Sequence, residues 1–402
     1  MHVEVGFSDN PDTTAAGIDA AREAISKARR VDACELVMLF ATVSHNASVL
    51  SDAVRSVVGN GARIVGGGAV GVITNDRYGY AGDQMGLACF WLDGADVDIF
   101  SEGNLHEGEL DTGRRLGRKL LDAEIDEDSQ VMLFYDAIDR TRGDIRLLMA
   151  THLLAGMESE MGFLPKLNGA GMMGDYGCSA VKQWIGSDIT DHHAMAMTFG
   201  GDVRIDSAIM HGCRPATRYY TVTKAMGPVI LEINGRPALQ FMDELLGGSI
   251  PPESYPFFLL FGVHSGEKWI AYDENIYASR LCLAIDRERD GIVMFEPDMA
   301  EGTEFQIMYR SLDLGYMKPK IDGIFERVGE SRRPVFALYI DCAGRAAGYG
   351  GVDLEDAVVL QDTVAGRVPV LGIYTGVEIS GIEGRPRGLD WTGVFCLFSV
   401  PE

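Results

Sequence analysis

The pattern of apolar positions near the N-terminus switches between helical spacing and unbroken runs of strand length. Apolar side chains recur every three or four residues from about 13 to 30 and from about 47 to 58, which predicts two amphipathic helices. Gly59 follows the second helix, as a C-terminal cap should. Four short apolar runs predict buried strands, with a turn at Asp93-Gly94 between the last two: ELVMLFAT, RIVGG, MGLACFWL and DVDIF.

The same order of features returns in the next hundred residues. QVMLFYDA matches ELVMLFAT, and a helical segment, IRLLMATHLLAGM, follows it. The glycine motif NGAGMMG matches GGGAVG, HHAMAMTF corresponds to MGLACFWL, and DVRID corresponds to DVDIF. Because chance rarely gives four matched features in one order, we infer an internal duplication with units at about 33–105 and 128–212.

A third and weaker copy closes the chain. PVFALYIDC is the expected strand, LEDAVVLQDTV the helix, VPVLGIYTG the glycine-bearing strand and WTGVFCLFSV the last strand. The segment before it, about 216–333, lacks the repeat but contains an apolar strand, PFFLLFGV. This arrangement predicts an α/β fold of mixed β-sheets with helices packed on their faces. We expect one domain over residues 1–216 and a second over residues 217–402.

Composition narrows the class of protein. The 402 residues carry a formal net charge of -24, which repels phosphate backbones and anionic headgroups, so nucleic acid and membranes are not expected partners. No apolar run reaches the roughly 18 residues that a membrane-spanning helix needs. The N-terminus lacks the pattern of a secretory signal. Seven cysteines without a C-x-x-C pair indicate a reducing compartment, so we expect a soluble cytoplasmic protein.

The sequence contains no familiar catalytic or cofactor-binding motif. The glycine-rich stretch GNGARIVGGGAVG follows a helix and enters a strand, the reverse of a phosphate-binding loop, so tight turns or close strand approach explain it better. The eight histidines show no zinc-ligand spacing, and no G-x-S-x-G elbow is present. We expect no cofactor. Haem is an alternative, because a single axial histidine leaves no spacing signature.

Cys342 is the first candidate for a site. It ends a predicted strand and stands three residues before Arg345, whose charge can lower the pKa of a neighbouring thiol. The simpler interpretation is a half-buried structural cysteine. Catalysis would also need a general base, and the candidates are His192, His193 and His211 in the other half of the chain.

The segment LGIYTGVEI carries the second candidate. Tyr374 and Glu378 stand beside Gly372 and Gly376 at the end of an apolar strand. A phenol and a carboxylate suit recognition of an ammonium or amide group. Together with Arg345 they offer both charge signs, which suits a zwitterion such as an amino acid. The alternative is a surface turn with a solvated glutamate.

These motifs resemble those of the FIST family. The string HGCRPATRYYTVTKAMGPVILEINGRPALQFMDELLG resembles the junction between the FIST N and FIST C regions. ALYIDCAGR, VPVLGIYTGVEI and GGGAVG also resemble family signatures, so the likeness covers about residues 30–400. The resemblance implies a sensory domain for small ligands, with amino acids proposed. Some bacterial members are similar to haem-dependent nitric oxide sensors that work with a histidine kinase in trans.

The leading hypothesis is a cytoplasmic small-ligand sensor that acts through a signalling partner such as a histidine kinase, with an amino acid as the candidate ligand. Two alternatives stay open: an enzyme with Cys342 as nucleophile and Arg345 as anion stabiliser, and a haem-binding nitric oxide sensor. The expected ligand-binding residues are Cys342, Arg345, Gly372, Tyr374, Gly376 and Glu378.

Overall fold

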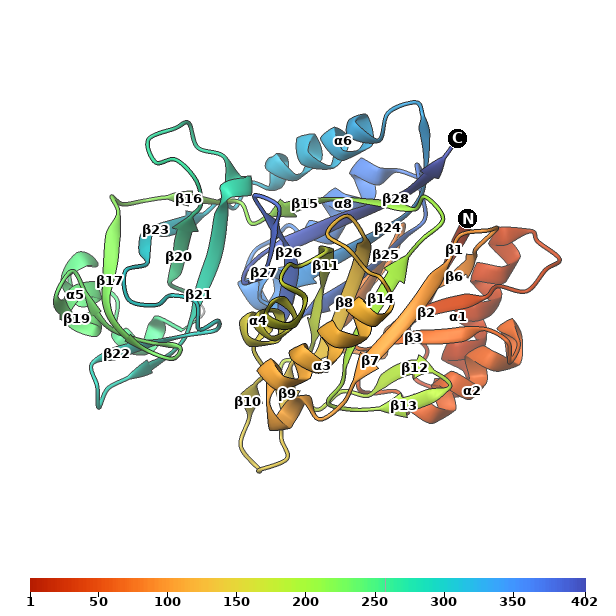
Figure 1. Cartoon of the computed structure of the whole chain (residues 1–402), viewed down its shortest axis with the longest axis horizontal. Coiled ribbons are helices and arrows are strands. Elements are labelled where there is room, and N and C mark those ends of the chain that lie inside the picture. Colours follow the sequence, from red (N-terminus) through yellow and green to blue (C-terminus); the bar gives the residue numbers. More distant parts are fainter. Residues whose placement is uncertain (257) are drawn as a thin grey trace.

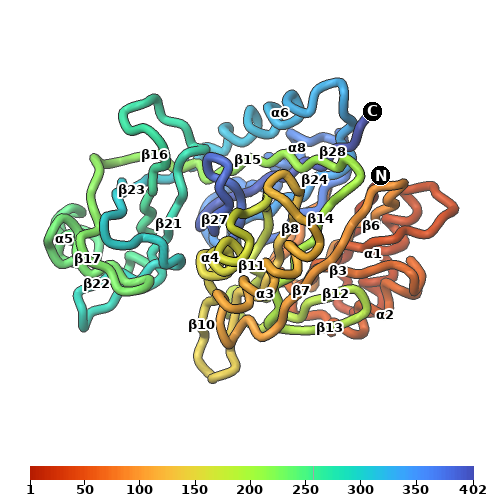
Figure 2. Tube along the Cα trace, viewed as in Figure 1, coloured from red at the N-terminus to blue at the C-terminus, as the bar shows by residue number. Residues whose placement is uncertain are grey.

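Three six-stranded sheets face one another around a shared apolar core in the computed structural model, which describes residues 1–256 and 258–402. An eight-stranded sheet stands beside this body (Figure 1). The N- and C-terminal segments lie close together (Figure 2), and the Met1 carbonyl accepts a hydrogen bond from Arg333, which belongs to the strand that pairs with the C-terminal strand. The α/β fold of mixed sheets predicted from the sequence is confirmed.

The three sheets share one strand pattern. Each has two parallel strands at its centre, flanked on one side by two antiparallel strands and on the other by a hairpin. The first sheet contains, in spatial order, β1 (His2–Ser8), β6 (Met85–Trp91), β2 (Leu36–Ala41), β3 (Arg63–Gly68), β12 (Gln183–Gly186) and β13 (Asp188–Thr190). The second contains β7 (Val97–Glu102), β14 (Ala194–Phe199), β8 (Gln130–Asp136), β11 (Lys166–Met172), β26 (Val377–Ile382) and β27 (Arg385–Leu389). The third contains β15 (Arg204–Met210), β28 (Gly393–Pro401), β24 (Arg332–Cys342), β25 (Val370–Thr375), β4 (Gly71–Thr74) and β5 (Tyr78–Tyr80).

A pair of helices covers the outer face of each sheet. The pairs are α1 (Thr13–Ala28) with α2 (Ala47–Val58), α3 (Glu109–Asp122) with α4 (Ala150–Met161), and α6 (Met317–Val328) with α8 (Asp356–Val364). Asp12 and Asn46 cap α1 and α2 through their side-chain oxygens. The predicted stop at Gly59 is observed, with φ of 92°.

Strand periodicity explains why the central strands are apolar throughout. Side chains alternate between the two faces of a strand, so on β2 Met38 and Phe40 enter the shared core while Val37 and Leu39 meet the helices. Aromatic pairs join the three sheets two at a time, with ring centroids 5.2 to 5.4 Å apart: Phe40–Phe134, Phe90–Phe336 and Phe199–Phe398.

In each unit, the hairpin that follows the second parallel strand pairs with the sheet of another unit. After β3 the chain leaves the first sheet, and β4 pairs with β25 of the third. After β11 it passes to the first sheet, where β12 pairs with β3, and after β25 it passes to the second, where β26 pairs with β11. The glycine motifs stand at these crossings. A Cβ atom on Gly169 would lie 1.8 Å from the Leu133 carbonyl oxygen, so close approach of parallel strands requires glycine there.

DVDIF, which the sequence groups with the first unit, forms β7 and pairs with β14 of the second sheet. The turn before it exists, because Asp93 and Gly94 have φ of 49° and 90°, but it does not close a hairpin between β6 and β7. Likewise β15, which contains most of DVRID, pairs with β28 of the third sheet. Common ancestry of the units and the division into domains at residue 216 stay proposals.

The segment between β15 and α6 forms the eight-stranded sheet with its own core. Its elements are β16 (Cys213–Pro215), β17 (Tyr220–Met226), β18 (Val229–Ile233), β19 (Arg236–Pro237), α5 (Ala238–Leu245), β20 (Leu260–His264), β21 (Tyr277–Asp286), β22 (Gly291–Met294) and β23 (Glu304–Arg310). The expected strand PFFLLFGV corresponds in part to β20, and its Phe257 lies outside the described residues. Short 3-10 turns occupy Leu105–Glu107, Pro252–Ser254, Glu274–Ile276, Leu314–Tyr316 and Ala343–Arg345.

Candidate functional site

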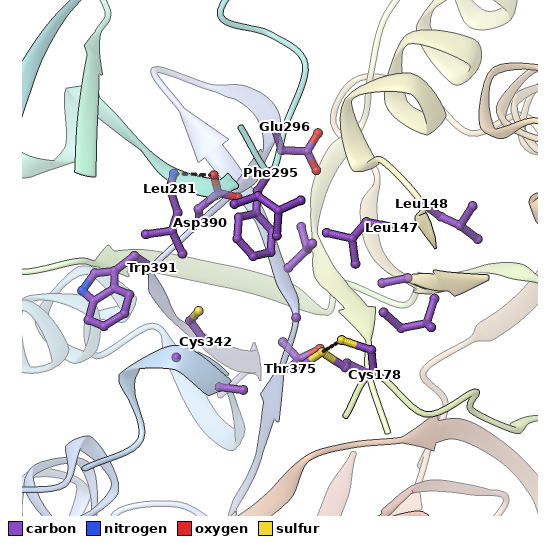
Figure 3. Close-up of a pocket in the computed structure, with 18 of the residues that line it drawn as sticks. Leu147, Leu148, Cys178, Leu281, Phe295, Glu296, Cys342, Thr375, Asp390 and Trp391 are labelled. Atoms are coloured by element: carbon purple, nitrogen blue, oxygen red, sulfur yellow. Dashed lines mark hydrogen bonds between the residues drawn. The ribbon is translucent and has the colours of Figure 1, made fainter. Parts of the chain in front are cut away.

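A cavity of about 310 Å³ lies where the second unit, the third unit and the eight-stranded sheet meet (Figure 3). Cys342 and Thr375 reach it from the adjacent C-terminal ends of the parallel strands β24 and β25. Ala137, just after the parallel strand β8, also lines it. The edge at which parallel strands end is a frequent place for ligands, because loops there enclose a crevice.

The remaining walls are mostly apolar. The short ribbon of β9 (Ile138–Asp139) and β10 (Arg146–Leu147) contributes one side, and Leu281 of β21 with Phe295 contributes the opposite side. Tyr176 and Tyr349 add two stacked rings, with centroids 4.7 Å apart. Such a wall, with few polar groups, is typical of small-molecule sites.

Glu296 is one of two carboxylates on this wall, and its role is structural. Its Oε1 accepts a hydrogen bond from the Ala150 amide at 3.1 Å, and its Oε2 accepts one from the Thr151 amide at 3.0 Å. These amides begin α4, whose preceding residue, Met149, gives no side-chain cap. A carboxylate at a helix N-terminus satisfies free N–H groups and the helix dipole. Glu296 therefore joins the eight-stranded sheet to the second unit.

Asp390 is the other carboxylate, and one of its two oxygens has a hydrogen-bond partner among the described residues. The side chain is buried, and its Oδ2 accepts a hydrogen bond from the Leu281 amide at 2.9 Å (Figure 3). Its Oδ1 has no hydrogen-bond partner in the part of the chain that the structure describes. Burial raises the pKa of Asp390 to about 7, against the opposing charge of Arg280. This carboxyl group can accept or release a proton near neutral pH.

Cys342 lines the cavity with a protonated thiol. Burial, followed by the charge of Glu378, raises the pKa of Cys342 well above its usual value, opposite to the lowering that a free Arg345 would cause. Within the described residues no histidine is hydrogen bonded to its sulfur. His211, for example, accepts from the Cys213 amide at 2.9 Å. This arrangement does not favour a thiolate nucleophile.

Arg345 lies behind the wall rather than on it. Its Nε contacts Asp341 and Asp356, each at 3.1 Å, and Nη2 donates to the Tyr316 hydroxyl at 2.8 Å. Its Nη1 donates to two backbone carbonyls, of His211 at 3.1 Å and of Trp391 at 3.4 Å. All three nitrogens are thus engaged within the protein. The nearest hollow, of about 30 Å³, has space for little more than a water molecule.

The other predicted residues divide between the wall and its support. Gly376 lines the cavity, and its amide donates to the Gly171 carbonyl at 3.2 Å. Gly372 lies inside the third sheet between Tyr339 and Ile73. Tyr374 is buried away from the cavity and donates its hydroxyl to Glu355 at 2.9 Å.

Glu378 is also outside the lining, and it holds the segment that carries Asp390. Its Oε2 accepts from the Thr392 amide at 3.2 Å, while its Oε1 has no partner among the described residues. Burial raises the pKa of Glu378 well above its usual value, and the charge of Asp341 adds to the effect. Arg345 donates a hydrogen bond to the Trp391 carbonyl, and Glu378 accepts one from the Thr392 amide. These two predicted residues therefore hold the segment 390–392 in place.

Sequence reasoning missed Asp390, Trp391 and Phe295. The available signal was the pair Asp390-Trp391 between two glycines, Gly388 and Gly393, immediately before the last buried strand. The pair stands in the loop between β27 and β28, and binding residues lie disproportionately on such loops.

A second hollow, of about 470 Å³, lies beside α4 but offers less to a ligand. Four of its charged side chains form two ion pairs with one another, and Glu383 is exposed to solvent. Arg385 contacts Glu158 at 2.9 Å, and Arg387 contacts Asp298 at 2.7 Å.

The cavity does not fit a haem group with an axial histidine. None of its lining residues in the described chain is a histidine, and its Cys342 is held as a thiol. The described residues also contain no group of three or more His, Cys, Asp or Glu side chains placed to hold a metal ion. Among them, no helix is both long and apolar enough to cross a membrane.

Comparison with known proteins gives the family. An uncharacterised protein of Mycobacterium bovis is 28% identical over 193 residues, 47% of this chain and 49% of the relative. An uncharacterised protein of Mycobacterium tuberculosis is 27% identical over 197 residues, 48% of this chain and 50% of the relative. The chain thus spans about half the length of these relatives. Residues 35–236 match the FIST N domain and residues 238–381 match the FIST C domain. The chain therefore belongs to the FIST family.

Proposed function

We propose that this protein is an intracellular small-ligand sensor, and that its ligand binds in the cavity at the ends of β24 and β25. The observation that carries the proposal is an apolar cavity of about 310 Å³ with a half-occupied buried carboxyl group, Asp390, on its wall. This volume is at the lower end of the range for small-molecule sites. Membership of the FIST family supports the same class of function.

The roles of the six residues expected from the sequence follow from their positions. Cys342 and Gly376 form the wall that a ligand touches. Arg345 and Glu378 position the segment 390–392 from behind the wall. Gly372 and Tyr374 hold their own strand, β25, in place. In this proposal the ligand contacts the segment that Arg345 holds, and not Arg345 itself.

The cavity suits a sensor because its walls come from parts of the chain that fold around different cores. Ile138 packs near the second unit, Cys342 ends a strand of the third, and Leu281 belongs to the eight-stranded sheet. A ligand touching all three favours the arrangement that brings them together, and it shifts the population toward that arrangement. We place the output in a signalling partner, such as a histidine kinase, that binds one arrangement in preference to the other.

Thermal-shift screening of the purified protein against metabolites, amino acids among them, tests the proposal. A ligand at a hundred times its dissociation constant should stabilise the protein by roughly 2.7 kcal/mol. Absence of any stabilising compound in a broad panel at millimolar concentration would count against a small-ligand sensor.

A cavity-filling variant then tests the location. Gly376→Leu adds a side chain to the cavity wall, and its first new atom would meet nothing closer than 3.4 Å, so the variant should fold. We expect affinity for the screened ligand to fall at least about tenfold, because the added volume excludes it. Isothermal titration calorimetry measures this.

Gly381→Leu is the matched control. Gly381 lies on β26, five residues further on, is exposed, and has no atom within 3.8 Å of a new Cβ. Equal affinity of the Gly376→Leu protein and the control would place the ligand elsewhere.

A further inference from the structure

The charged side chains that line the cavity, in the part of the chain that the structure describes, are all acidic. Its charged lining residues, in the described chain, are Glu296 and Asp390, and none is a lysine, arginine or histidine. Glu296 has both oxygens bonded to the amides of α4. Asp390 is the group left with a free oxygen, Oδ1, among the residues described.

We infer that the ligand is a hydrophobic amine without a carboxylate, whose ammonium group binds Asp390. This inference rests on the proposed function and names the ligand class of the same site. An ammonium group supplies the hydrogen-bond donors that Oδ1 lacks, and a charge-assisted bond in a dry site is among the stronger polar contacts. Phe295, Trp391 and Leu281 give the body of such a molecule an apolar surface.

The same geometry disfavours acids and zwitterions. A ligand carboxylate in this cavity would face the charges of Asp390 and Glu296 without a cation on the wall. The three arginines behind the wall are engaged elsewhere. Arg280 is paired with Asp298, Arg310 lies over the Trp391 ring at 4.7 Å and donates to Gly350, and Arg345 is held by Asp341 and Asp356.

A set of four indole probes tests the inference on the full-length protein by calorimetry at pH 8. The probes share one apolar body and differ in the group at the end of the side chain: tryptamine, tryptophol, indole-3-propionate and tryptophan. We expect tryptamine to bind most tightly and indole-3-propionate at least about tenfold more weakly. Binding of the acid or of tryptophan as tight as that of tryptamine would overturn the inference.

Asp390→Asn supplies the second arm. The substitution keeps the size of the side chain and removes its charge. We expect tryptamine affinity to fall roughly 10- to 100-fold, and affinity for the neutral tryptophol to stay within about threefold, which also reports that the variant is folded. Asp188→Asn, an exposed site on β13, controls for the change in net charge. Unchanged tryptamine affinity in Asp390→Asn would contradict the inference.

The outcomes separate this inference from the proposed function. If tryptophol or the acid binds as tightly as tryptamine and Gly376→Leu abolishes that binding, the cavity is a ligand site but the assignment of an amine is wrong. If no probe binds and the metabolite screen is also negative, both fail.

Discussion

The two carboxylates on the cavity wall differ in how many of their oxygens are used, and not in how deeply they lie. Glu296 and Asp390 are both buried, with 1% and 3% of their surface exposed. Both oxygens of Glu296 accept hydrogen bonds from the first amides of α4, whereas one oxygen of Asp390 accepts a hydrogen bond from the Leu281 amide. A buried polar atom without a partner costs free energy, which persists most often where function requires it. In the proposed function, Asp390 is therefore the residue on the cavity wall on which ligand binding depends.

The pKa of Asp390 predicts a pH dependence of stability. Its pKa is about 7 in the folded protein, against about 3.9 in an unfolded chain. The folded state holds the proton more tightly, so this contribution to stability is complete below about pH 4 and is lost as pH rises through 7. Asp390→Asn replaces the titrating carboxyl group with an amide, which does not titrate. The free energy of unfolding of the variant relative to wild type should rise by about 1.4 kcal/mol per pH unit between about pH 5 and 7, then level off.

Urea denaturation of both proteins at several pH values measures this difference. The charged and titratable groups that face Asp390 are Arg280 of β21, Glu296, Asp298, Glu378 of β26 and Tyr135 of β8. They are present in both proteins, so their own titration largely cancels. A difference in unfolding free energy that does not change with pH would show that Asp390 is not the titrating group.

At the residue scale, some of the residues predicted from the sequence line the cavity and others lie behind its wall. Cys342 and Gly376 were predicted and line the cavity. Arg345 is predicted to bind the ligand because, together with Glu378, it offers both charge signs to a zwitterion. Its carboxylate partners, Asp341 and Asp356, are four and eleven residues away, and no spacing rule reveals that they neutralise it.

At the scale of elements, the glycines are explained by strand packing. Gly66, Gly169 and Gly372 occupy equivalent positions, each on the second parallel strand of its sheet and opposite Leu39, Leu133 and Tyr339. A Cβ atom on Gly66 would lie 2.0 Å from the Leu39 carbonyl oxygen. The order of helix and strand in the sequence favours tight turns or close strand approach, since a phosphate-binding loop runs the other way.

This packing predicts the effect of adding one methyl group. Gly169→Ala forces β8 and β11 apart, because the new atom would lie 1.8 Å from the Leu133 carbonyl oxygen, which is backbone and cannot turn aside. We expect a loss of about 3 kcal/mol or more in the free energy of unfolding. Gly381→Ala, whose new Cβ would meet nothing closer than 3.8 Å, should change it by less than about 0.5 kcal/mol. Chemical denaturation compares the two, and equal stabilities would refute this account of the motif.

Element types were easier to predict from the sequence than element partners. The runs ELVMLFAT, QVMLFYDA and VFALYID are strands because both of their faces are covered, which makes them apolar throughout. The sequence did not predict the exchange of hairpins between units. The strands β4, β12 and β26 pair with strands of another unit, and their residue pattern does not indicate which strand that is. Tertiary context decides such pairings.

At the scale of the whole molecule, hairpin exchange makes the three units one body, and the eight-stranded sheet rests on its edge (Figure 1). Polar links across that contact near the cavity include the Glu296 cap on α4 and the Asp390 bond to Leu281. The Arg387–Asp298 ion pair and the hydrogen bond from Arg310 to Gly350 also cross it. In the proposed function, a ligand in the cavity acts on this contact, where a hollow lies between the parts of the molecule.

A crystal structure of the protein with the strongest ligand from the thermal-shift screen tests the central claim most directly. The account predicts electron density in the cavity, in contact with Cys342 and Gly376, with a ligand hydrogen-bond donor on Asp390 Oδ1. Density for the ligand in the hollow beside α4, with the cavity between β24, β25 and the eight-stranded sheet left without it at saturating concentration, would contradict the account.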